Sequence, residues 1–152
     1  MNSLINRLNP KTTQFDAAGT GSSVGSITAA DVCIAISYAK LSPVRCELVR
    51  LKCLNEATPA RVSCLADQLM AHFADAFKST GMELSVLKSC IVAALAEFCL
   101  VPATYKPSGR NRAMFIGVGE TTYRRHNLAV WVDKISSQLA IDYADSMAQL
   151  SD

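Results

Sequence analysis

Apolar residues recur at intervals of three and four along most of the chain after residue 27, which is the spacing of one face of an α-helix. The clearest case follows Thr58-Pro59, where the recurring apolar positions are Val62, Leu65, Leu69, Phe73 and Phe77. Thr58 is a good capping residue, proline is tolerated at a first helical position, and glycine often follows a last one. The pattern predicts a long amphipathic helix that ends before Gly81.

Two helices are predicted before it. The first begins after Thr28, and Asp31 at its third position favours the positive end of the helix. Pro43 interrupts that helix and opens the second, because proline disfavours helix at the preceding residue but fits a first position. The apolar face of the second helix comprises Val44, Leu48 and Leu51.

A fourth helix is predicted after Gly81, and a further long helix near the C-terminus. The fourth has apolar residues at Leu84, Leu87, Ile91, Leu95 and Phe98, and its middle is apolar nearly all round, so we expect it to be the most buried. The terminal one has Leu128, Trp131, Ile135, Leu139, Tyr143, Met147 and Leu150. We expect it to pack the C-terminal region onto the core, or to offer a surface to a partner or a second copy.

No segment shows the sustained alternation of a strand, so we predict an all-α protein. Residues 1–27 lack periodicity and are rich in glycine and serine, which is typical of a disordered arm, with a marginal helix over Ser3–Leu8. Residues 28–100 are predicted to form a four-helix core, and residues 101–152 a helix-turn-helix and a terminal helix packed on it. With neither a transmembrane stretch nor a secretory signal in the sequence, we expect a cytoplasmic protein without a membrane partner.

The charge of the chain is unevenly distributed. Among 152 residues, half of them apolar, 15 are Lys or Arg and 13 are Asp or Glu, so the formal net charge is +2. This balance argues against a polycation and against an acidic disordered tail. Residues 106–134, however, contain six cations and two anions and carry +4, so the remainder carries −2. A polyanionic partner is therefore expected to bind at the basic segment.

The basic segment has the plan of a helix-turn-helix. A first helix over about Gly109–Ile116 has the small residue Ala113 where a second helix would cross it. Gly117 suits a turn that needs a positive φ, Val118 would fill the corner, and Tyr123 would anchor the second helix. A solvated basic face on a plain helical turn is the other interpretation of this pattern.

The helix-turn-helix interpretation predicts which side chains meet double-stranded DNA. The second helix would present Glu120, Thr121, Thr122, Arg124 and Arg125 to the major groove or its phosphates. Arg110 and Arg112, on the first helix, would reach the flanking backbone. His126 follows two arginines and is expected to extend the basic face.

The chain contains six cysteines. None of them forms a C-x-x-C pair or lies at metal-ligand spacing from a histidine, so we expect buried free thiols rather than a metal site. No nucleophile has a nearby base in a recognisable arrangement, and His72 is expected to be an ordinary surface or boundary histidine. We therefore predict no catalytic residue, no metal and no cofactor.

Four features follow one another along the chain: Ala30-Asp31-Val32, the run Val86–Cys99, Thr121-Thr122-Tyr123 and Trp131. Their order resembles that in the lambda-type branch of the lambdoid phage late-gene antitermination protein Q family. The resemblance covers about residues 24–150. It implies a factor that binds DNA at a late promoter, engages paused bacterial RNA polymerase with its sigma factor, and makes the polymerase resistant to terminators. It also implies DNA contacts from the helix-turn-helix residues named above.

The chain departs from that family at one place. Lambda-type members have a zinc-binding insertion with paired C-x-x-C motifs before the helix-turn-helix, where this chain has only residues 101–109 without cysteine. The chain is therefore either a shortened, zinc-free relative or a more remote one. Two other interpretations stand beside an antitermination factor. One is a dimeric helix-turn-helix repressor or activator, and the other is a helical interaction module that does not bind nucleic acid.

Overall fold

A computed structural model describes residues 28–102 and 104–151, and this part of the chain consists of helices and connecting segments without a strand. The expectation of an all-α protein is confirmed for these residues. The predicted disordered arm over residues 1–27, with its possible helix at Ser3–Leu8, lies outside them. None of the described helices has the length and apolar character needed to cross a membrane.

The helices begin and end close to the predicted positions. They are α2 (Ala29–Tyr38), α3 (Pro43–Cys53), α4 (Pro59–Phe77), α5 (Leu84–Leu100), α6 (Gly109–Ile116), α7 (Glu120–Arg125) and α8 (Leu128–Ser151), with a 3₁₀ turn η1 (Lys78–Thr80) after α4. Thr28, Ser42 and Thr58 cap the first three, each accepting a bond from a backbone N–H of the first turn.

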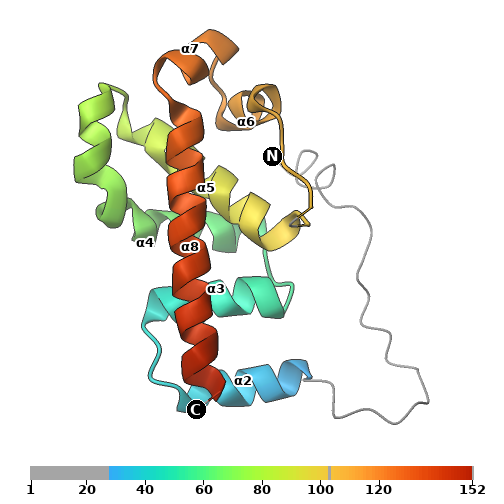
Figure 1. Cartoon of the computed structure of the whole chain (residues 1–152). Helices are drawn as coiled ribbons and strands as arrows, with labels where there is room; N and C mark the ends of the chain where they lie inside the picture. The colour runs from blue at the N-terminus through green and yellow to red at the C-terminus, as the bar shows by residue number, and fades with distance from the viewer. Residues whose placement is uncertain (1–27, 103, 152) are drawn as a thin grey trace.

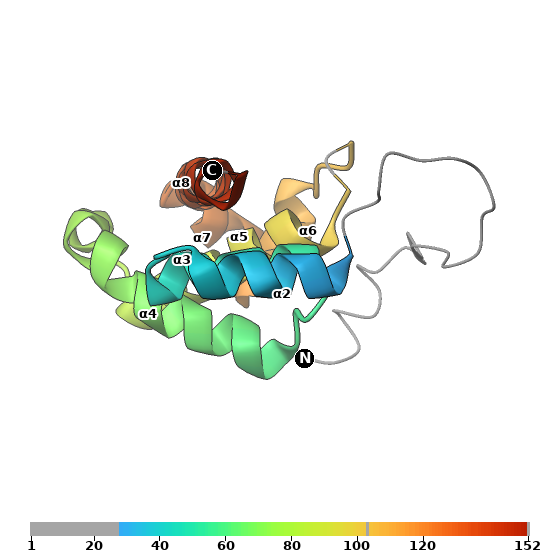
Figure 2. The same cartoon turned by 90° about the horizontal axis from the view of Figure 1, so that it is seen from below.

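Helix α8 runs along nearly the whole molecule and crosses α5 and α3 (Figure 1). Seen from below, α8 lies on one side of α3 and α5, and α4 lies on the other (Figure 2). The short helices α6 and α7 sit at the end of the molecule where α8 begins, and α2 lies at the opposite end. The basic segment therefore lies at one end of the packed helices.

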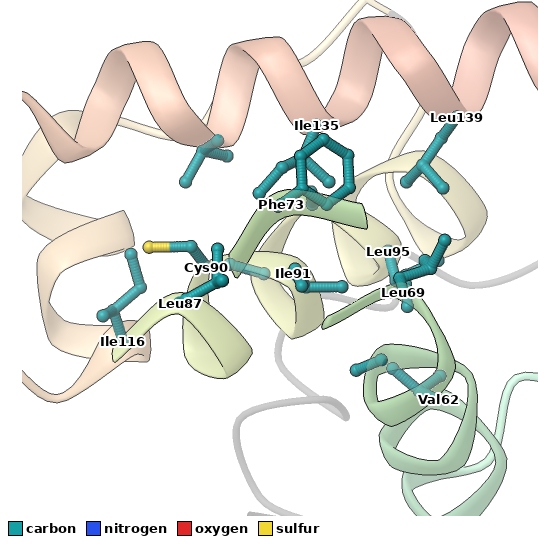
Figure 3. Packing of buried hydrophobic residues seen from close by; sticks show 14 of the residues in the cluster. Val62, Leu69, Phe73, Leu87, Cys90, Ile91, Leu95, Ile116, Ile135 and Leu139 are labelled. Atoms are coloured by element: carbon teal, nitrogen blue, oxygen red, sulfur yellow. The ribbon is translucent and has the colours of Figure 1, made fainter. Parts of the chain in front are cut away.

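One continuous hydrophobic core joins α3, α4, α5, α6, α7 and α8. Helix α5 lies at its centre, with seven buried residues, which confirms that it is the most buried helix. Figure 3 shows Ile135 and Leu139 of α8 directed toward the cluster that contains Phe73, Ile91 and Leu95. Because the same core extends from α3 to α8, packing fixes the position of the basic segment relative to the other helices.

Two sequence expectations need correction. The sequence predicts helix α2 as part of the four-helix core, yet Ile36 is its one buried residue and none of its side chains joins the main cluster. The sequence also predicts buried cysteines, but Cys90 alone is fully buried among the six free thiols, while Cys33 and Cys64 are exposed. Both errors arise because an apolar helical pattern does not say how much of the helix surface a neighbour covers.

Candidate nucleic-acid interface

The chain reverses direction between α6 and α7 within three residues. Ser108 caps α6 by accepting a bond from the Asn111 backbone N–H at 3.2 Å. Gly117 ends the helix with a left-handed φ of 85°, and its N–H donates to the Ala113 carbonyl at 3.0 Å. The Val118 N–H donates to the same carbonyl at 3.0 Å, and α7 starts after Gly119. The glycine therefore supplies the positive φ that this tight turn requires.

The inner side of the α6–α7 pair is buried. Ala113, Ile116 and Tyr123 belong to the main core, and Val118 packs against it. A Cβ added at Gly109 would lie 3.5 Å from a ring carbon of Tyr123, which places the first turn of α6 directly against that ring. The inward positions predicted for Ala113, Val118 and Tyr123 are thus the positions observed.

The outer side is polar and mostly exposed. The exposed residues predicted as DNA contacts are Arg110, Glu120, Thr121, Arg124 and Arg125, and Thr122 is half-buried. Arg124 forms an ion pair with Glu120 one turn earlier, yet its side chain remains 76% exposed. An exposed pair of this kind contributes little stability, so Arg124 is available to another anion.

Arg112 differs from the other predicted contacts. Its guanidinium donates to both carboxylate oxygens of Glu97 on α5 at 2.8 and 2.7 Å, and to Asp133 on α8 at 2.9 Å. The Arg112 side chain is only 14% exposed, and these carboxylates raise its pKa. The expectation that Arg112 reaches a DNA backbone therefore conflicts with its placement, because the side chain is largely buried and three of its five N–H donors are bonded to carboxylates within the protein.

Arg112 also lies beside the hydroxyl of Tyr123. Burial raises the pKa of that phenol, and the positive charge of Arg112 partly opposes the shift. The same cation therefore connects α5, α6 and α8 and borders the anchor residue of α7. Neither Glu97 nor Asp133 could be found from helical spacing, because their pairing depends on how distant segments pack.

His126 does not extend the basic face as expected. Its Nδ1 lies 3.1 Å from the carbonyl oxygen of Thr80, in the turn between α4 and α5. This contact attaches the end of α7 to the core. Lys134 lies with its Nζ 5.0 Å from the centre of the Trp131 ring, a cation–π contact on α8.

The described residues contain no cluster of three or more histidine, cysteine or acidic side chains placed to hold a metal ion. No protein-family profile, curated protein sequence or solved structure matches this chain.

Proposed function

We propose that α6, the turn at Gly117 and α7 form a helix-turn-helix that binds double-stranded DNA. The observation that carries this proposal is the division of α7 into a buried side, anchored by Tyr123, and an exposed side with Thr121, Arg124 and Arg125. Arginine and threonine side chains bind both phosphates and base edges. Arg110 on α6 adds a flanking phosphate contact, and Arg112 keeps the two helices in place.

We further propose that the protein is a phage-type transcription antitermination factor whose partners are promoter DNA and bacterial RNA polymerase with its sigma factor. Two observations support this proposal. One is the resemblance to the late-gene antitermination protein Q family, and the other is the distance along the molecule between the basic helices and the end formed by α2 and α3. The basic helices lie at one end of α8, and α2 and α3 lie near the other (Figure 1). DNA bound at one end leaves the opposite end free for a protein partner.

A second candidate is a dimeric repressor or activator with the same DNA-binding end. One observation favours it. Helix α2 exposes the apolar side chains of Ile34 and Tyr38, with Tyr38 84% exposed, and a second copy could cover this surface. Sedimentation of the protein on DNA distinguishes the two candidates, since a repressor of this kind forms a tight dimer on a symmetric site.

Transcription in vitro tests the leading proposal. The template has a promoter, a promoter-proximal pause and a downstream terminator, and bacterial RNA polymerase is supplied with its sigma factor. We expect the protein to increase readthrough, and the increase to require the DNA upstream of the pause. If readthrough does not change when the protein is added, antitermination on that template is excluded. DNA binding is tested separately by measuring affinity at several salt concentrations, where we expect a steep salt dependence.

A further inference from the structure

A cavity of about 550 Å³ is lined by residues of α5 and α8, by Arg112 of α6, by residues 105–107 ahead of α6, and by Lys52 of α3. This volume falls within the range of small-molecule sites in proteins. It admits a small molecule but no nucleic-acid duplex, so the cavity is separate from the proposed DNA-binding surface. Its most informative lining residues are Lys52, Phe98, Tyr105, Lys106, Arg112 and Ser136.

The charges of the lining favour an anion over a cation. The two carboxylates that line the cavity, Glu97 and Asp133, are both bonded to Arg112. Lys52 and Lys106 supply the remaining charges, and the lining as a whole carries a net charge of +1 from three cations and two anions. Lys52 donates one hydrogen bond to the Phe98 carbonyl at 2.6 Å, which leaves two ammonium donors.

The lining also contains a hydroxyl that has no partner among the described residues. The Oγ of Ser136 on α8 is buried and makes no hydrogen bond within the described part of the chain. A buried hydroxyl without a partner is unfavourable, so a bound molecule with an acceptor would be stabilised there. Ser137 differs, because its Oγ already donates to the Asp133 carbonyl at 2.9 Å.

Aromatic surface lies close to the lysines. The Nζ of Lys52 is 4.0 Å from the centre of the Phe98 ring, and Tyr105 at the rim is half exposed. A planar base can stack on an exposed aromatic side chain of this kind. The cavity thus combines two ammonium groups, an unsatisfied hydroxyl and an aromatic rim.

We propose that this cavity binds a nucleoside monophosphate. Lys52 and Lys106 hold the phosphate, Ser136 donates to an oxygen of the ligand, and the base lies against Tyr105. A free mononucleotide and one nucleotide of a single strand share this chemistry. The site does not depend on the proposed DNA binding, because it uses none of the exposed residues of α7.

Isothermal titration calorimetry with the full chain tests the proposal. The probes are adenosine 5′-monophosphate, adenosine, inorganic phosphate and a single-stranded trinucleotide of adenylate. We expect saturable binding of the monophosphate, with adenosine and phosphate each weaker by about tenfold or more, because each lacks one half of the contacts. Tighter binding of the trinucleotide supports the same chemistry and assigns its source to a strand.

Two variants locate the site without loss of the fold. Lys106→Ala removes an exposed side chain, and Ser136→Ala removes a hydroxyl whose loss is expected to leave the unfolding temperature unchanged or higher. Both variants should weaken binding of the monophosphate by about tenfold. Lys88→Ala is the matched control, because Lys88 pairs with Asp67 at 2.7 Å outside the cavity.

The proposal is overturned if the monophosphate does not bind, or if it binds the two variants as tightly as the original protein. Adenosine binding as tightly as its monophosphate overturns the assignment of the lysines. NMR chemical-shift mapping with the monophosphate shows which residues the ligand contacts. Changes at Phe98 and Ser136 support the cavity, whereas changes confined to Arg124 and Arg125 overturn it.

Discussion

Arg112 on α6 and Glu97 on α5 form a two-pronged ion pair, in which Nε and Nη2 donate to the two carboxylate oxygens at 2.8 and 2.7 Å. The two side chains are 14% and 15% exposed, so the pair is largely removed from water. A parallel pair of charge-assisted bonds fixes orientation as well as distance. This contact therefore adds to the packing of Ala113, Ile116 and Tyr123 in fixing the orientation of α6 and α7 on the core.

Arg112→Met should destabilise the protein by about 3 kcal/mol, because it leaves the Glu97 carboxylate shielded from water without its partner. Urea unfolding followed by circular dichroism measures this change. The double variant Arg112→Met with Glu97→Gln should recover part of the loss, since it removes both charges. A cost below about 1 kcal/mol for the single variant would place the pair among ordinary surface ion pairs.

Gly117→Ala should destabilise the protein by about 1 to 2 kcal/mol. The φ of Gly117 is 85°, and no atom beyond the adjacent residues lies within 4 Å of a Cβ added there, so the expected cost is conformational rather than steric. Thermal unfolding checks this prediction. Gly119→Ser is the matched control two residues away, because the φ of Gly119 is −66° and serine is favoured at a helix N-cap. Equal losses for the two variants would contradict the assigned role of Gly117.

Alkaline pH should weaken the fold through Cys90. Burial raises the pKa of this thiol from 9.0 to about 12. Below pH 9 the thiol is protonated in both the folded and the unfolded protein, so it makes its full contribution to the free energy of unfolding. Above pH 9 the unfolded chain loses the proton while the folded chain keeps it, so stability falls until the pH approaches 12.

The measurement is urea unfolding at pH 8 and pH 10.5. The original protein should lose about 2 kcal/mol more than Cys90→Ala over this interval, because the variant lacks the titrating group. Other titrating residues are common to both proteins and cancel in the difference. Identical losses would mean that the Cys90 thiol ionises as easily in the folded protein as in the unfolded one.

The sequence predicted the helices well because their start signals are local. The Thr28 and Thr58 caps, Pro43 and the glycines at 81 and 117 act within one turn, and the apolar spacing identified faces that meet the core. The role of Arg112 could not be predicted in this way. Glu97 is 15 residues away and Asp133 is 21 away, so their meeting depends on helix packing.

The same limit applies to His126 and to the cavity. His126 follows Arg124 and Arg125 in the sequence, yet it faces Thr80, 46 residues away. The residues that line the cavity come from α3, α5, α6, α8 and the connection between α5 and α6, and no local motif joins Lys52 to Ser136. The exposed side of α7 could be predicted from the sequence, because the polar positions of a short amphipathic helix follow from its residue spacing.

Arg124→Ala combined with Arg125→Ala should weaken DNA binding while the fold stays intact. Both arginines are exposed, and the ion pair of Arg124 with Glu120 is a surface pair of little energetic value. Each lost base contact should cost about 1 to 3 kcal/mol, and phosphate contacts should cost less. Fluorescence anisotropy with labelled promoter DNA at several salt concentrations measures the change, and the salt slope should also become shallower.

A matched control separates specific contacts from total charge. Lys40→Ala combined with Arg50→Ala removes the same two positive charges from exposed positions near α2 and α3, at the other end of α8. Screening by salt limits the reach of such charges to about 10 Å at moderate ionic strength, so this variant should bind DNA almost as the original protein does. If both double variants lose affinity equally, general electrostatic attraction explains the binding and α7 is not a recognition helix.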